Sequence, residues 1–432
     1  MITTHQNGGT ITVMLAARAI NPLSRLFQRE LGTLIDKLET QRTQLHGVIV
    51  GFHSEAADAD HELEHLMTLT TAQAGDCMHM LGAYNSLLRR LESLGIPVIA
   101  TLSGLVGGHA LGLALACHRR IGLEQASFSL PQVHLGMTPV AGEIARTVRL
   151  AGLQAAMPLL LEGATLSASQ ALKAGLLHAV ADDEEQVAEL VRHALEADLP
   201  ALQPWDAKAW RLPGGELNSA PVLTLLQVSP AMLRERTGGH APAPEAILCA
   251  MVEGLQVDFD TALLIESRYF CQAAISPVAR NLMRLSQIKC DLASPAAAEF
   301  AATLRQAYAV EAGALRAEGA SEAMLRNAAR AAGLPPPPDA AVAVSTAAAP
   351  AGETPPAPPF DDMRDRLLYA LVHATHAAIA AGDIGGDEAD LASVRLCGFP
   401  AHSGGASRFV EYVGKDSYVK RSIALKMTPF SL

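Results

Sequence analysis

Residues 93–117 contain no Asp, Glu, Lys or Arg. A stretch of this kind is expected to be buried, either in a membrane or in a protein core. A helix that crosses a membrane needs about 20 continuous apolar residues, whereas this stretch contains Pro97, His109 and five glycines. The pattern therefore predicts no membrane span. It predicts a buried strand at residues 97–102, a glycine-rich turn at 104–109 and a buried helix after the turn.

Strand-like and helix-like segments alternate on both sides of this stretch. Residues 10–16 and 47–52 are short runs of the kind that forms buried strands, and helix-like stretches follow at 22–38 and 62–94. Parallel sheets covered by helices produce this alternation. The N-terminal part is therefore predicted to be an α/β domain.

Composition excludes several classes of protein. With 50% hydrophobic and 18% charged residues the chain can bury a core. The net charge is −11 and no basic run occurs, so we expect no nucleic-acid partner. The six cysteines are scattered without a Cys-x-x-Cys pair, which predicts no metal site and a reducing, cytoplasmic location. Neither end has the pattern of a targeting signal.

The second half of the chain changes in character. Residues 183–290 are more helical, and residues 296–333 are Ala-rich and helical. A segment with nine Pro and eight Ala in 25 residues follows at 335–359. Such a composition cannot build a core and predicts an extended linker. The pattern of residues 364–381 then predicts an amphipathic helix that ends near Gly382.

Several motifs in the first 290 residues resemble the crotonase superfamily, specifically the hydratase half of the bacterial fatty-acid-oxidation alpha subunit. They are the strand and turn at 96–104 (IPVIATLSG), the helix at 113–121 (LALACHRRI), and the segments 130–136 (LPQVHLG), 139–142 (PVAG) and 161–176. The similarity continues through 204–206 (PWD), 212–215 (LPGG), 242–247 (PAPEAI) and 259–270. The resemblance implies a crotonase-like spiral domain followed by the connecting helices of that subunit.

The C-terminal part resembles a 3-hydroxyacyl-CoA dehydrogenase C-terminal domain in two pieces. The implied organisation is a crotonase-like domain at 1–182, an all-α connector at 183–290, a first helical repeat at 291–333, a Pro/Ala linker at 334–360 and a second helical repeat at 361–432. The family carries an NAD-binding domain between connector and repeats, and here it is missing. No Gly-x-Gly occurs in the chain to hold a pyrophosphate. We therefore expect no NAD cofactor and no dehydrogenase activity.

The resemblance also assigns site residues. In the family, two backbone N–H groups form an oxyanion hole for the thioester, and two Glu handle the water and the α-proton. The hole corresponds to Ala59 and His109, and the two Glu positions hold Gly112 and Gln132. Glycine has no side chain and Gln is no base at neutral pH. Ordinary hydration should therefore be lost.

Two residues near these positions are candidates for a relocated acid or base. Glu143 follows the turn at 139–142, and His134 lies two residues after Gln132. Each also has a simpler interpretation. Glu143 would be a solvated residue at a helix N-terminus, favoured by the helix dipole, and His134 would be a packed or surface side chain.

Two functions remain open. The first is an acyl-CoA-binding protein of β-oxidation-type metabolism that is catalytically degenerate, a pseudoenzyme or a scaffold. The alternative is an active enoyl-CoA hydratase/isomerase-type enzyme with a relocated acid/base such as Glu143. In both, an acyl-CoA thioester is the ligand and no further cofactor is needed. A homo-oligomer or hetero-oligomer is expected, with a thiolase or another β-oxidation protein as candidate partner.

Overall fold

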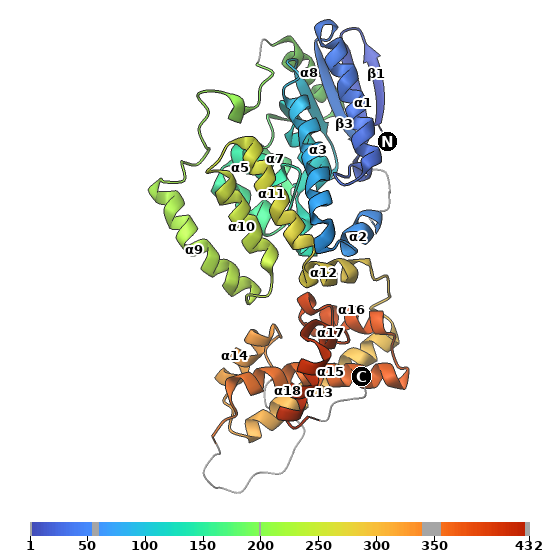
Figure 1. Cartoon of the computed structure of the whole chain (residues 1–432), viewed down its shortest axis with the longest axis vertical. Coiled ribbons are helices and arrows are strands. Elements are labelled where there is room, and N and C mark those ends of the chain that lie inside the picture. Colours follow the sequence, from blue (N-terminus) through green and yellow to red (C-terminus); the bar gives the residue numbers. More distant parts are fainter. Residues whose placement is uncertain (1, 54–59, 198–199, 339–355, 428–432) are drawn as a thin grey trace. The chain divides into compact units, whose positions relative to one another are not determined.

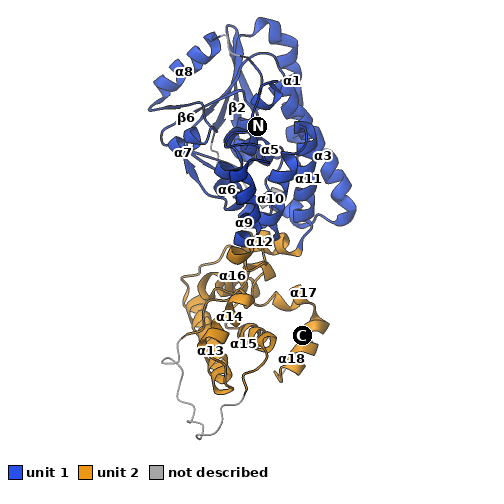
Figure 2. Ribbon diagram, turned by 90° about the vertical axis from the view of Figure 1, so that its left-hand side faces the viewer, with its two compact units in different colours: residues 1–233, 242–276 blue, residues 234–241, 277–432 orange. Residues whose placement is uncertain are grey.

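The computed structural model describes residues 2–53, 60–197, 200–338 and 356–427. These residues form two compact units, which Figure 2 colours separately. Unit 1 comprises residues 1–233 and 242–276, and unit 2 comprises residues 234–241 and 277–432. The finer division into five segments stays a prediction. Most of the proposed Pro/Ala linker lies outside the described residues.

A six-stranded sheet organises the described part of unit 1 (Figure 1). Its spatial order is β1-β2-β3-β4-β6-β9, with β1 and β2 antiparallel and the other neighbours parallel. The strands are β1 (Ile2–Asn7), β2 (Thr10–Ala16), β3 (Gly47–His53), β4 (Val98–Leu102), β6 (Arg119–Leu123) and β9 (Ala179–Ala181). The three predicted strands, now β2, β3 and β4, are confirmed. β1 adds an edge strand that the sequence pattern did not indicate.

The predicted helix at 62–94 is wrong as a single element. It consists of α2 (Asp60–Met67), a 3-10 turn η3 (Thr71–Gln73) and α3 (Ala74–Glu92). The interruption has a local cause, because the Thr70 N–H and hydroxyl both donate to Oε1 of Gln73. This capping arrangement starts a new helix at η3. The predicted helix at 22–38 is confirmed as α1 (Arg25–Gln41), which begins after Ser24.

The charge-free stretch folds into a strand, a turn and a buried helix. After β4, residues of the glycine-rich turn form a short strand β5 (Leu105–Gly107), which is more order than the turn predicted there. β5 pairs in parallel with β7 (Ser127–Ser129), and β7 pairs with β8 (Leu166–Ser167) to complete a second, three-stranded sheet. The buried helix is confirmed as α4 (His109–Leu115), in which residues 110–115 are all buried.

Further helices complete unit 1. They are α5 (Glu143–Ala151), α6 (Leu153–Leu161), α7 (Ala168–Lys173), α8 (Glu184–Glu196), α9 (Ala220–Thr237), α10 (Pro242–Gly254) and α11 (Phe259–Ala274), with 3-10 turns η1 (Ala17–Ala19), η2 (Arg42–Gln44), η4 (Pro131–Leu135) and η5 (Pro204–Asp206). The end of α9, from residue 234 on, belongs to unit 2. Helices α10 and α11, from the predicted connector, pack on α5. Part of the connector therefore belongs to the same packed unit as the α/β core.

One aromatic ring joins the connector to α5. Phe259, the first residue of α11, stacks on Trp205 with ring centroids 4.7 Å apart. The guanidinium carbons of Arg89, Arg146 and Arg149 lie 4.9, 5.4 and 5.1 Å from the centre of the same ring. Cation–π contacts in such a desolvated setting stabilise by about 2 kcal/mol, so this cluster helps to fix α5 against α11.

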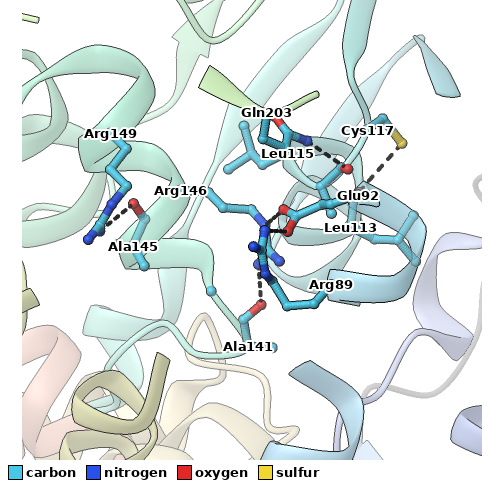
Figure 3. Close-up of polar contacts among 12 residues, drawn as sticks. Arg89, Glu92, Leu113, Leu115, Cys117, Ala141, Ala145, Arg146, Arg149 and Gln203 are labelled. Carbon is cyan, nitrogen blue, oxygen red and sulfur yellow. Dashed lines mark hydrogen bonds and ion pairs between the residues drawn. The ribbon is translucent and has the colours of Figure 1, made fainter. Parts of the chain in front are cut away.

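A buried ion pair links α5 to α3 (Figure 3). Arg146 Nε donates to Oε1 of Glu92 over 2.7 Å, and both side chains are 0% exposed. Glu92 also accepts from Arg89, which reaches Asp206 in η5. The Arg146 fork further donates to the Ala141 carbonyl over 2.9 Å, just before α5. The carboxylate of Glu92 therefore neutralises the charge of Arg146 in the core.

Unit 2 is helical throughout its described part. Its helices are α12 (Pro277–Gln287), α13 (Pro295–Ala317), α14 (Glu322–Ala332), α15 (Phe360–Ala381), α16 (Gly386–Cys397), α17 (Phe409–Val413) and α18 (Lys415–Ala424), with the 3-10 turn η7 (Ala401–Ser403). The predicted helix at 364–381 is confirmed as α15, which ends at Gly382 with φ +80°. Among the described residues, no helix is long and apolar enough to span a membrane.

Replacing Glu92 by Gln should destabilise unit 1 by about 3–5 kcal/mol, because Arg146 would keep its charge in the core without a carboxylate. Both tryptophans of the chain, Trp205 and Trp210, lie in unit 1. Their fluorescence during urea unfolding therefore measures this unit.

The matched control is Asp36→Asn, which removes an exposed carboxylate 2.6 Å from Arg90. Exposed pairs contribute at most about 1 kcal/mol. Equal losses of stability in the two variants would contradict a structural role of the buried pair.

Candidate active site

Glu143 is the first residue of α5 and is 0% exposed. The two residues before it have left-handed backbone conformations, Ala141 with φ +63° and Gly142 with φ +82°. This turn directs the first residue of α5 into the interior. The simpler interpretation of Glu143 as a solvated helix-terminal residue is therefore wrong.

Three groups hold the Glu143 carboxylate. His109 Nδ1 lies 2.6 Å from Oε1, and Gln132 Nε2 donates to Oε2 over 2.6 Å. The backbone N–H of Val140 also donates to Oε2, over 3.2 Å. The contact with His109 joins a ring nitrogen to a carboxyl oxygen, so one proton lies between Nδ1 of His109 and Oε1 of Glu143. Residues from α4, η4 and α5 thus meet at one carboxylate.

Gly112 in α4 leaves room for that carboxylate. A Cβ atom at position 112 would lie 2.7 Å from Cγ and 3.0 Å from Oε1 of Glu143. Such distances are below van der Waals contact, so a side chain at 112 and the present position of Glu143 exclude each other. The two positions that the sequence marked as altered, 112 and 132, therefore both border Glu143.

The other predicted site residues lie apart or are not described. His134 is on the exposed side of η4, and a Cβ at Gly163 would lie 2.6 Å from its Nε2. It does not join the carboxylate cluster. Ala59, the predicted first oxyanion position, lies outside the described residues. His109, the second position, begins α4, and the first N–H groups of a helix have no acceptor within the helix.

Glu266 is a site residue that the sequence reasoning missed. It comes from α11, is 1% exposed, and accepts hydrogen bonds from the backbone N–H groups of Gly142 over 2.8 Å and Ala145 over 3.0 Å. It thus caps the first turn of α5 from a helix more than 100 residues away in sequence. A signal was present, because Glu266 falls on the buried face of α11 between Leu263 and Phe270.

Burial raises the pKa of Glu266 to about 8. The neighbouring Glu143 raises it further, while the hydrogen bond from Ala145 and the charge of Arg146 lower it. Near neutral pH this carboxyl is mostly protonated. It therefore adds little negative charge beside Glu143.

Comparison with known proteins identifies this architecture. Residues 5–199 match the family described as enoyl-CoA hydratase/isomerase. This part of the chain is thus a crotonase-family domain, as the sequence motifs indicated.

The chain is also homologous to the fatty acid oxidation complex subunit alpha of Shewanella loihica, with 27% identity over 270 residues. That alignment covers 62% of this chain and 37% of the relative, so the chain spans little more than a third of the relative's length.

The solved structures to which the chain is similar include two proteins described as hydratases. An enoyl-CoA hydratase/carnithine racemase from Magnetospirillum magneticum is 26% identical, with a TM-score of 0.40, over 46% of this chain and 75% of that one. An enoyl-CoA hydratase from Bacillus anthracis is 23% identical, with a TM-score of 0.39, over 63% of this chain and 90% of that one.

A side chain at position 112 and the Glu143 carboxylate would occupy the same space. The effect of Gly112→Ala on stability should therefore change sign when Glu143 is removed. Gly112→Ala should destabilise unit 1 by about 1–3 kcal/mol, because it overpacks the core. In a Glu143→Ala background the same substitution should stabilise it by up to about 1 kcal/mol, since Ala is the better helix former. Tryptophan-monitored urea unfolding of the four proteins measures both effects.

Gly82→Ala in α3 is the control, because a Cβ there meets nothing within 4 Å. It should be mildly stabilising in both backgrounds. If Gly112→Ala changed the stability in the same direction in the wild-type and Glu143→Ala backgrounds, its Cβ would not be competing with Glu143.

Glu266 predicts a pH dependence of stability. Its pKa is about 8 in the folded protein against an ordinary value of 4.5, so the folded state binds its proton more tightly. The stabilisation that results from this tighter proton binding is complete at pH values below the ordinary pKa. It is lost as the pH rises toward the folded-state pKa, by up to about 1.4 kcal/mol per pH unit.

Glu266→Gln should therefore flatten the decline in stability between pH 5 and pH 8, measured by urea unfolding with tryptophan fluorescence. Glu216→Gln, at an exposed glutamate of the same unit, should leave the slope unchanged. Equal slopes in the wild type and Glu266→Gln would show that the buried carboxyl titrates normally.

Proposed function

We propose that this chain is an acyl-CoA-binding protein of the enoyl-CoA hydratase/isomerase type in which Glu143 is the working acid/base. The observation that carries the proposal is that Glu143 fills the space a side chain at position 112 would need. By the family resemblance, position 112 is where a catalytic Glu is expected. A carboxylate from α5 thus stands in for a carboxylate from α4.

The contacts of Glu143 suit proton transfer. One oxygen faces the His109 imidazole and the other faces the Gln132 amide. His109 can take up or return a proton at Nδ1, whereas Gln132 has no titratable proton and only orients the carboxylate. The site therefore offers one proton-transfer pair instead of two carboxylates.

A single pair of this kind restricts the reaction. Removal and return of the proton next to a thioester carbonyl requires one base, and a backbone N–H at the start of α4 would stabilise the enolate oxygen. Addition of water requires a second group to activate the water. We therefore propose proton exchange or double-bond isomerisation of an acyl-CoA as the main activity, with hydration weak or absent.

The second candidate function is that of a catalytically degenerate protein. Gln132 in place of a carboxylate favours it, because Gln cannot replace a base. In that case the Glu143–His109 pair would stabilise the fold without turnover, and the protein would act as an acyl-CoA-binding scaffold.

The remaining assignments belong to the same proposal. Unit 2 would be the remnant of a dehydrogenase C-terminal domain, with no NAD cofactor and no dehydrogenase activity. The name of the Shewanella relative contains the word complex, which supports oligomerisation and a partner from fatty acid oxidation, such as a thiolase. A cytoplasmic location fits this pathway.

The test is exchange of the α-protons of butyryl-CoA in D2O, followed by NMR on the full chain. Glu143→Gln should lower the exchange rate by about 10²–10⁴, the usual contribution of a general acid/base. Binding of butyryl-CoA, measured by calorimetry, should stay within a few-fold of the wild type, and crotonyl-CoA hydration should be slow or absent.

Glu124→Gln, at an exposed glutamate after β6, is the matched control and should exchange at the wild-type rate. Undiminished exchange in Glu143→Gln would refute the relocated base. If the wild type bound butyryl-CoA without exchanging its α-protons, the hypothesis of a catalytically degenerate protein would be supported instead.

A further inference from the structure

A cavity of about 530 Å³ opens in unit 2. All of its lining residues belong to that unit, and they come from residues 234–241, α12, α14 and the segment around η7. Pockets of several hundred Å³ are the size that encloses a metabolite. The cavity is larger than an inorganic ion requires.

The charge of the cavity is positive although the chain carries a net −11. Three guanidinium groups line it, from Arg236, Arg326 and Arg330, against one carboxylate from Glu235. Arg326 and Arg330 lie four residues apart on α14, so their side chains share a face of the helix. Among the described residues neither has a carboxylate within ion-pair distance. The nearest acidic influence is Glu322, one turn before Arg326, whose pKa is lowered by Arg316 and further by Arg326.

Two like charges at this spacing cost stability in a helix. Arg330 is in the last turn of α14, where the helix dipole favours a cation. The dipole does not account for Arg326, which lies one turn earlier. An anion between the two guanidinium groups would remove the repulsion, and guanidinium forks match phosphate oxygens in geometry.

Part of the cavity wall is apolar and ring-bearing. Leu334, Phe399 and Pro400 line it and are buried. Beside them the imidazoles of His240 and His402 stack with centroids 4.4 Å apart and planes 8° apart. Burial, followed by the nearby His240, lowers the pKa of His402 to about 4, so this ring is neutral at physiological pH. A planar neutral group fits such a wall better than a second phosphate would.

We propose that this cavity binds a nucleotide, with its phosphates between Arg326 and Arg330 and its base toward Leu334, Phe399 and Pro400. The inference is independent of the acid/base proposed for Glu143, because it uses only residues of unit 2. A nucleoside diphosphate has the charge that two guanidinium groups can match and a ring for the apolar wall.

Calorimetry on the full chain tests the proposal with ADP, pyrophosphate and adenosine as probes. ADP should bind more tightly than pyrophosphate or adenosine. Arg326→Gln and Arg330→Gln should each weaken ADP binding by at least about tenfold, the effect of losing about 1.4 kcal/mol from a charge-assisted contact.

Arg395→Gln is the matched control, because Arg395 is an exposed arginine of unit 2 that does not line the cavity. It should change ADP binding less than twofold. The two test arginines are themselves exposed, and circular dichroism of each variant checks that the fold is kept.

Three results would overturn the proposal. They are no binding of ADP at millimolar concentration, equal weakening by Arg395→Gln, and ADP binding that both cavity variants leave unchanged, which would place the nucleotide elsewhere. Pyrophosphate binding as tightly as ADP would overturn the assignment of the base to the apolar wall. Failure here leaves the butyryl-CoA exchange by Glu143 untouched, so the two proposals fail separately.

Discussion

The space beside α4 admits one side chain, either from position 112 or from position 143. In this chain Gly112 vacates it and the carboxylate of Glu143 fills it. The rest of the site follows from this arrangement, because His109 then contacts one oxygen of the carboxylate and Gln132 the other. The absence of a side chain at position 112 and the burial of the Glu143 carboxylate are therefore two parts of one packing arrangement.

That arrangement depends on a turn that needs support. Ala141 and Gly142 both adopt left-handed conformations, which are costly for a residue with a Cβ such as Ala141. Arg146 holds the Ala141 carbonyl, and Glu266 holds the Gly142 amide. Arg146 in turn requires Glu92 as its counter-ion. The position of one carboxylate therefore depends on the buried carboxyl groups of Glu92 in α3 and Glu266 in α11, one in an ion pair and the other hydrogen-bonded to backbone amides.

Much of the fold could be predicted from the sequence, because burial leaves a local pattern. The absence of charge at 93–117 was sufficient to predict β4 and α4. The break at Thr70 was missed because it rests on one short capping arrangement within an otherwise helical stretch. The burial of Glu143 could not be predicted, since a Glu at a helix start is usually solvated and favoured by the dipole. Glu266 was missed because its partners lie 121 and 124 residues away, and no local pattern encodes that distance.

The contact of Glu266 with α5 also sets an order of events during synthesis. The region that matches the hydratase family ends at residue 199, but the acceptor for the Gly142 and Ala145 amides is made only 67 residues later. A nascent chain that has emerged as far as α9 has its sheet, yet the first turn of α5 still lacks its cap and Arg149 still lacks Phe259. Because a domain folds as a unit while the chain is made, unit 1 is complete only after α11 has been synthesised, and this helix lies outside the region that matches the family.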